Sequence, residues 1–219
     1  MKCPRCVQRI HRAAADCPHC GFTIHDADVR FEKMEVRLRC LTDRAGILRR
    51  KDRERVSAAM ARISRRLPQV FVAVYAGALG EVASMRMFGF WLLNRGVFED
   101  VTDDQPREAG ILLTIDPESK AAGMAFGYRL DPFLEESDTF ECLLRGHAYW
   151  LEQRYAEGLV RALSHLEGIL CKRSRQARWS PGYYQRKAGL PVVREDAMRR
   201  THDGHGHHFG LNKEVGERP

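Results

Sequence analysis

The chain has 219 residues, of which 44% are hydrophobic and 30% are charged, a composition typical of one medium-sized globular domain with appendages. Its formal net charge of +7 is concentrated at one end, because residues 171–219 hold eleven Lys and Arg against five Asp and Glu. The rest of the chain is nearly neutral, so the high pI says little about what a folded domain binds.

The N-terminus and the cysteine count bear on the compartment. Met1-Lys2 runs straight into Cys3 without an apolar segment, so no signal peptide is expected. The longest apolar stretch, residues 70–79, is about half of the roughly 20 residues that a membrane crossing needs, so no membrane span is predicted. Seven cysteines, four of them in CxxC pairs, favour metal and reduced thiols over a disulfide framework. We therefore expect a cytoplasmic protein.

Residues 1–29 contain two C-x₂-C pairs separated by ten residues. The four thiols are Cys3, Cys6, Cys17 and Cys20. This spacing predicts a short zinc ribbon in which four thiolates complete a tetrahedral Zn²⁺ site, with most of the folding free energy supplied by the metal. Gly21 lets the backbone turn close to sulfur after the second pair, whereas Val7 occupies that place after the first. Two disulfides, unliganded thiols or a rubredoxin-like iron site are the alternatives. Nearby histidines are expected on the surface: His11, His19 and His25.

The next segment, residues 30–67, contains one clear helix. Residues 30–40 are ambiguous between strand and linker, and residues 50–67 carry apolar side chains at intervals of 4, 3 and 4. These side chains are Val56, Met60, Ile63 and Leu67. The spacing predicts an amphipathic helix with an arginine-rich outer face. That face is read as solvated, with a phosphate or nucleic-acid site as the alternative.

Strands and helices then alternate. Pro68 ends the first helix, residues 69–75 read as a buried strand, and residues 81–95 read as a helix covered on much of its surface. Two short apolar runs within residues 110–130, separated by Asp-Pro-Glu-Ser, predict two buried strands joined by a tight turn.

Two helical stripes follow the hairpin. The first consists of Phe140, Leu144, His147 and Leu151, and the second of Leu159, Leu163, Leu166 and Leu170. His147 is read as a core histidine on the first stripe. Three further thiols are read as inert: Cys40, Cys142 and Cys171.

Three stretches carry a resemblance to the TPM domain family. Residues 41–48 (LTDRAGIL) resemble its opening motif, residues 110–130 (GILLTIDPESKAAGMAFGYRL) resemble its central hairpin, and residues 154–159 (RYAEGL) resemble its last helix joint. The resemblance implies an α/β domain over residues 30–171: a small twisted sheet with helices on both faces. It also implies phosphatase-like or photosystem-repair-type relatives that bind calcium through clustered carboxylates.

The resemblance places an acidic cleft around Asp43, Asp116, Arg129 and Asp131. Asp43 keeps a family acidic position, but Ser119, Ala125 and Arg129 stand where relatives carry Asp, Glu and Gly. Loss of two acids and gain of a cation make Ca²⁺ or another divalent cation in this domain doubtful. We expect Arg129 to replace the metal and to pair with Asp43, or otherwise with Asp131 or Asp116; the alternative is that Arg129 points into solvent.

Residues 172–219 are rich in Arg, Lys, Ser, Gly and Pro without a periodic apolar face, so a flexible, solvated tail is predicted. Aromatic and basic residues alternate at its start, a composition that can stack bases or sit at a membrane surface. The His-rich residues 201–208 can bind a transition metal loosely.

Three functions are consistent with these observations. The favoured one is a non-catalytic binding or scaffold module that docks onto a protein partner. The alternatives are a divalent-metal-dependent, phosphatase-like hydrolase and a nucleic-acid-associated protein that binds through the ribbon and the basic tail.

Overall fold

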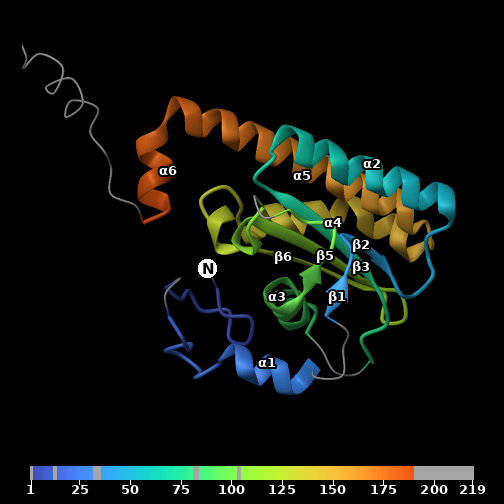
Figure 1. Cartoon of the computed structure of the whole chain (residues 1–219), viewed down its shortest axis with the longest axis horizontal. Helices are drawn as coiled ribbons and strands as arrows, with labels where there is room; N and C mark the ends of the chain where they lie inside the picture. Colours follow the sequence, from blue (N-terminus) through green and yellow to red (C-terminus); the bar gives the residue numbers. More distant parts are fainter. Residues whose placement is uncertain (1, 12–13, 32–35, 81–83, 103–104, 190–219) are drawn as a thin grey trace, which may run out of the picture.

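The computed structural model describes residues 2–11, 14–31, 36–80, 84–102 and 105–189, and a four-stranded sheet forms its centre (Figure 1). The strands are β2 (Leu41–Asp43), β3 (Phe71–Ala76), β5 (Gly110–Asp116) and β6 (Ala121–Phe126). Their order is β2-β3-β5-β6, with the first three parallel and β6 antiparallel to β5. Helices pack on both faces, so the predicted α/β class with a small covered sheet is confirmed.

The two central strands are apolar on both sides. Every residue of β3 and β5 is buried. In β3, Val72 and Val74 join the core on one face, while Phe71 and Tyr75 join the core on the other. A strand covered on both faces reads as a continuous apolar run, which is why these two strands are recognisable in the sequence.

Three helices cover the first face: α2 (Arg50–Arg66), α4 (Glu136–Leu151) and α5 (Tyr155–Trp179). Figure 1 shows α2 and α5 lying side by side along the top of the molecule, and they share an extensive contact. The helix predicted over residues 50–67 is confirmed, with its four apolar positions buried.

The second face is covered by α3 (Met85–Arg95), with α1 (Ile24–Phe31) packed against it. A separate parallel pair, β1 (Arg37–Leu38) and β4 (Val97–Phe98), lies beside them. The buried residues of α3 include Phe88, Trp91 and Leu92, which confirms the predicted covered helix. The first residues predicted for it, 81–83, lie outside the described residues.

The predicted hairpin over residues 110–130 is confirmed as β5 and β6. Short 3-10 helices precede and follow it, η2 (Arg107–Ala109) and η3 (Tyr128–Leu130). The β6 strand is half-buried throughout because it forms one edge of the sheet.

The stripe predicted for the first helix after the hairpin is wrong about which face is buried. Phe140, Leu144 and Leu151 are 62%, 53% and 50% exposed, and His147 is exposed with them. The buried face of α4 instead consists of Asp138, Thr139, Cys142, Gly146 and Trp150. Small residues on that face let α4 approach α5 closely, so the larger aliphatic side chains are left outside.

The sequence-based boundaries both fall inside helices. The break expected after residue 29 lies within α1, and the break expected after residue 171 lies within α5. The prediction of a structureless tail is wrong for residues 172–187, which complete α5 and form α6 (Pro181–Lys187). The rest of the predicted tail, including the His-rich residues 201–208, lies in residues 190–219 and outside the described residues.

Candidate metal centre

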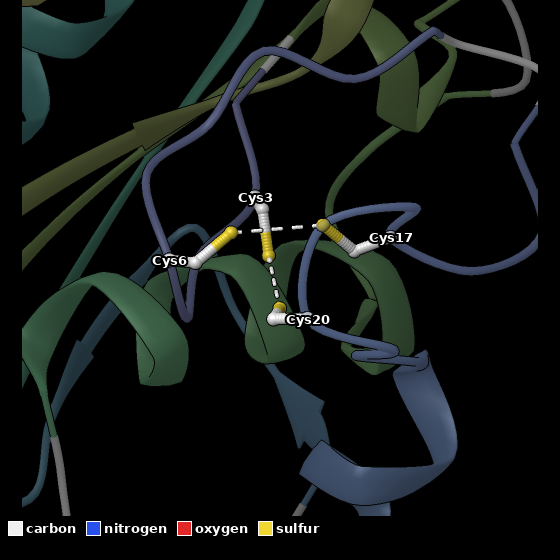
Figure 2. A group of neighbouring side chains, drawn as sticks. All are labelled: Cys3, Cys6, Cys17 and Cys20. Atoms are coloured by element: carbon white, nitrogen blue, oxygen red, sulfur yellow. Dashed lines mark hydrogen bonds between the residues drawn. The ribbon is translucent and has the colours of Figure 1, made fainter.

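The four cysteines of the two CxxC pairs meet at one point (Figure 2). Their sulfur atoms all lie within 4.8 Å of one another, with 3.7 Å between Cys3 and Cys20 and 3.6 Å between Cys6 and Cys17. A tetrahedral cation with sulfur ligands at about 2.3 Å requires sulfur–sulfur distances of about 3.8 Å. The cluster therefore has the size and the donor number of a four-thiolate metal site.

The two CxxC pairs have the same backbone geometry. The N–H of Val7 donates to the carbonyl of Cys3 at 3.0 Å, and the N–H of Gly21 donates to the carbonyl of Cys17 at 2.8 Å. Val7 and Gly21 both adopt the left-handed region, with φ of 66° and 68°. Each turn thus needs a positive φ after its second cysteine, which glycine adopts readily and valine does not.

The pKa values of the cysteine thiols explain why a bound cation would stabilise this cluster. Burial raises the pKa of Cys3, and burial together with the neighbouring thiols raises the pKa of Cys20 to about 12. At Cys17 burial acts in the same direction, but N–H groups of His19 and Cys20 outweigh it and lower the pKa to about 7. Four thiolates this close repel one another, so a bound cation is what allows all four to be deprotonated together.

The N-terminal segment that carries the four cysteines, residues 2–11 and 14–31, is here called the cysteine module. It packs into the core on the second face of the sheet. Cys3 and Cys17 are 0% and 1% exposed and belong to the same apolar cluster as Phe22 and Phe31 of the module and Phe88 of α3. The rings of Phe31 and Phe88 meet edge-on, with centroids 5.4 Å apart. Metal site and helix α3 therefore share one core.

A polar contact reinforces this junction. Asp28 of α1 accepts two hydrogen bonds from Arg95, at 2.9 and 2.6 Å, and one from the indole N–H of Trp91 at 3.1 Å. The Arg95 contact is the main reason that the pKa of Asp28 lies below its usual range, and the Trp91 contact adds to it. These bonds link α1 to two residues that lie one helical turn apart at the C-terminal end of α3.

The structure is consistent with the roles expected for His11, His19 and His25 and for Cys40 and Cys142. Among the described residues, no histidine joins the metal-sized cluster, and His11, His19 and His25 are all exposed. Burial raises the pKa of Cys142 to about 12, and burial with the neighbouring Asp100 carboxylate raises that of Cys40 to about 12. Thiols with such high pKa values are poor nucleophiles.

At the carboxyl edge of the sheet, Asp43 serves as a structural anchor. Its side chain is fully buried, and its oxygens accept hydrogen bonds from the N–H groups of Ile47 at 3.1 Å and Leu48 at 3.0 Å. A third bond, also 3.0 Å, comes from the guanidinium of Arg53. Asp43 thus fixes the loop that leads into α2.

Asp116 lies at the same edge, because β3 aligns Ala76 with both Asp43 on β2 and Ile115 on β5. It is 2% exposed and accepts N–H groups from Leu79 at 3.3 Å and from the turn residues 118 and 119 at 2.9 and 3.3 Å. Its role here is to close the hairpin turn and to hold the segment after β3.

The proposed pairing of Arg129 with Asp43 is wrong. Because β6 is antiparallel, its end returns to the start of β5, where the N–H of Gly127 donates to the carbonyl of Gly110 at 2.9 Å. Arg129 and Asp131 follow Gly127. The length of strand β5, about 20 Å, therefore separates them from the edge that carries Asp43 and Asp116. The predicted cleft therefore separates into two pairs of residues at opposite ends of the sheet.

Sequence reasoning missed the actual partner of Asp43. Arg53 was grouped with the solvated arginines of its helix, although it lies in the first turn of α2 and folds back onto the loop before it. The missed signal is local: a helix that begins seven residues after a strand-end Asp places its first arginines within reach of that carboxylate.

No helix in the described part of the chain is both long enough and apolar enough to cross a bilayer.

Comparisons with known proteins identify no family. No family model matches the chain, and no curated protein matches it. Among solved structures, the chain is similar to the N-terminal domain of a protein from Porphyromonas gingivalis, with 19% identity, a TM-score of 0.48, and coverage of 66% of this chain and 88% of that one. It is also similar to the N-terminal domain of a protein from Corynebacterium glutamicum, with 13% identity, a TM-score of 0.45, and coverage of 59% and 78%. At these values the likeness assigns no function to the chain.

Proposed function

We propose that this chain is a non-catalytic binding or scaffold module: a TPM-like α/β domain whose N-terminal part is held by one structural Zn²⁺. The observation that carries the proposal is that both buried carboxylates already accept hydrogen bonds from within the protein. Asp43 and Asp116 each accept three hydrogen bonds from within the protein, out of the roughly four that a carboxylate can accept. Little capacity is left on either for a hydrolytic metal ion.

The choice of Zn²⁺ rests on the donor set. Four thiolates in a tetrahedron suit Zn²⁺, and a closed set of four protein ligands leaves no open position for a substrate or a reactive water. Bound there, the ion would supply neutralisation of the thiolate charges and a cross-link between the two turns. Iron fits the same ligands, and metal analysis separates the two.

The TPM-like assignment of the main domain is part of the proposal. Its support is that the three resembling stretches fall on structurally coherent positions. They form β2 with the loop anchored by Asp43, the β5–β6 hairpin, and the start of α5.

A partner protein is proposed as the target of the module. The exposed stripe on α4 supports it, because Phe140, Leu144 and Leu151 place three large apolar side chains in line on one helix face. We also propose a reducing compartment such as the cytoplasm. Its support is that all seven cysteines are free, four of them gathered at the metal centre.

The hydrolase alternative requires carboxylates that are free to bind a divalent cation and to orient a water molecule. At the shared edge both carboxylates are engaged, and at the opposite end Arg129, two residues before Asp131 in the sequence, contributes a fixed positive charge. These features favour the scaffold function over hydrolysis.

The test is metal analysis of freshly purified, untagged protein together with a generic phosphatase assay in added Ca²⁺ or Mg²⁺. We expect about one equivalent of zinc, which Cys17→Ser abolishes, and no turnover above background. Asp43→Asn should lower the free energy of unfolding by roughly 1–3 kcal/mol, because it weakens buried hydrogen bonds. Calcium-dependent turnover that Asp43→Asn abolishes would contradict the non-catalytic function.

A further inference from the structure

The segment formed by the end of α5 and the short α6, residues 172–189, is here called the α5–α6 corner. It contains six Lys and Arg and no Asp or Glu. The six are Lys172, Arg173, Arg175, Arg178, Arg186 and Lys187. A stretch of this length with only positive charge on ordered helices presents a fixed cationic surface rather than a fluctuating one.

Two of the six cations hold the corner onto the body. Arg173 binds both the carbonyl of Phe133, at 2.9 Å, and the carboxylate of Asp138, at 2.6 and 2.8 Å. Lys187 donates to the carboxylate of Glu135 at 2.8 Å. These bonds fix the orientation of the whole corner.

The other four cations have no carboxylate partner among the residues that the structure describes. Lys172, Arg175, Arg178 and Arg186 are all exposed. Their charge is therefore not neutralised within the described part of the protein, and it is available to an anionic ligand.

An exposed aromatic side chain lies among these cations. Trp179 is 88% exposed, the highest value among the large apolar side chains of the described residues, and Tyr183 is 53% exposed. Lys172, Arg175 and Trp179 recur at intervals of three and four, so they share one face of α5. The Trp179 ring thus lies one helical turn from Arg175 and two turns from Lys172 along the same face.

A cavity opens next to this face. Its volume is about 500 Å³, and its lining includes Tyr183 and Tyr184 together with Lys187 and its carboxylate partner Glu135. Ser180, the residue after Trp179, also lines it. That volume is within the range of sites that hold small organic groups, roughly 300–1,000 Å³. Trp179 itself does not line this cavity, so the proposed base contact is on the open helix face beside it.

We infer that the α5–α6 corner binds single-stranded nucleic acid, with phosphates on Lys172, Arg175 and Arg178 and an unpaired base stacked on Trp179. Grooves for single strands combine cations that follow the backbone with aromatic rings that stack bases. A duplex offers no exposed base face to a side chain on a helix surface, so a single strand fits better. An anionic membrane fits less well, because residues 172–189 contain no Leu, Ile, Val, Met or Phe to insert between lipids.

The residues of this surface are distinct from the cysteine cluster and from the sheet edge that carries Asp43 and Asp116. Its test therefore succeeds or fails independently of the proposed function.

Intrinsic fluorescence reports directly on this surface. The chain has three tryptophans, of which Trp91 and Trp150 are 3% and 6% exposed, so Trp179 dominates the solvent-exposed emission. Titration of the full chain with a 12-nucleotide DNA or RNA should quench this emission. The affinity should fall with salt, with a log–log slope of roughly −2 to −3 for three or four phosphate contacts.

Matched variants separate stacking from charge. Trp179→Ala, followed by fluorescence anisotropy of a labelled oligonucleotide, should weaken binding by roughly ten-fold through loss of one stacked base. Arg175→Glu should weaken binding and reduce the salt slope. Lys51→Glu makes the same charge change at the far end of α2 and should leave affinity within about two-fold.

Three results would overturn the inference. One is an affinity for the oligonucleotide that Trp179→Ala leaves unchanged. Another is equal binding of heparin, which has charge but no bases. The third is binding of vesicles containing anionic lipid in place of the oligonucleotide.

Discussion

At the scale of single residues, the metal site depends on two positive φ angles that the sequence fills unequally. Gly21 has φ of 68°, and a Cβ placed on it would meet no atom within 4 Å. Any penalty for a larger residue there comes from the backbone conformation and not from a clash. Val7 already adopts this conformation as a β-branched residue, at a cost of roughly 1–2 kcal/mol.

Gly21→Val should therefore weaken metal binding by roughly ten-fold, which corresponds to about 1.4 kcal/mol of backbone strain. Competition with a chromophoric zinc chelator measures this change. Val7→Gly is the matched control, and it should bind metal at least as tightly as the natural chain. An unchanged affinity in Gly21→Val would show that the turn relaxes when metal is bound.

Residue-level prediction from sequence succeeded where the chemistry is local. The four cysteines are identifiable because CxxC spacing alone brings two sulfurs to one side of a cation. The acidic cleft failed because it required the relative direction of two strands. The tight turn predicted between β5 and β6 already implies an antiparallel pair, which carries Arg129 away from Asp43; the family resemblance was followed instead of this consequence.

At the scale of elements, α4 and α5 are held together by close approach of their backbones. A Cβ on Gly158 would lie 2.3 Å from the indole nitrogen of Trp150 and 2.8 Å from the carbonyl oxygen of Gly146. A Cβ on Gly168, on a different side of α5 from Gly158, would meet nothing within 4 Å. The same helix thus contains one glycine required by packing and one that packing does not require.

These two glycines make a matched pair for mutation. Gly158→Ala should destabilise the protein by roughly 1–3 kcal/mol, because overpacking forces Trp150 or the helix to shift. Gly168→Ala should instead stabilise it by roughly 0.5–1 kcal/mol, because alanine favours an exposed helix interior. Urea unfolding of both variants measures the two signs, and equal effects would contradict the close contact.

This contact also explains why the α4 stripe was misread. Apolar periodicity identifies a helix but not which face is buried when both faces carry apolar residues. In α4 the buried face is built from Gly146, Thr139 and Cys142 around Trp150, and these small side chains contribute little to a hydrophobic pattern. By contrast, α2 has charged residues opposite its apolar stripe, so its orientation was predictable.

At the scale of the whole molecule, the α5–α6 corner contributes to the body although its composition resembles that of a solvated tail. Tyr184 stacks on Phe133 with ring centroids 5.2 Å apart, and Lys187 pairs with Glu135. Both contacts reach elements more than 50 residues away in the chain. Because such contacts leave no local pattern, the sequence alone favoured a tail.

Truncation after residue 175 should therefore lower Tm by about 3–6 °C, since the lost stacking and a partly exposed ion pair amount to roughly 1–2 kcal/mol. Truncation after residue 189 keeps the contacts of the corner with Phe133 and Glu135 and serves as the control for loss of the remaining residues. Differential scanning calorimetry at fixed metal loading compares the two. Equal Tm values for the two truncations would show that the corner adds no stability.

The metal centre and the main domain form one structure rather than two, and this governs what loss of the metal does. Cys3 and Cys17 share an apolar cluster with Phe88 and Trp91 of α3. The opposite face of the sheet, covered by α2 and α5, has a separate cluster. Loss of the metal should therefore spread into α3 but stop at the sheet.

Cys17→Ser tests this directly. We expect α1 and α3 to lose amide protection by roughly ten-fold or more, because the cluster that they share loses its metal cross-link, while α2 and α5 keep theirs. Hydrogen exchange followed by mass spectrometry resolves these helices, and added zinc should not restore the variant. Lys120→Ser, at the exposed hairpin turn, controls for substitution itself. Protection lost only within residues 2–11 and 14–31 would instead establish the cysteine module as an independent unit with its own stability.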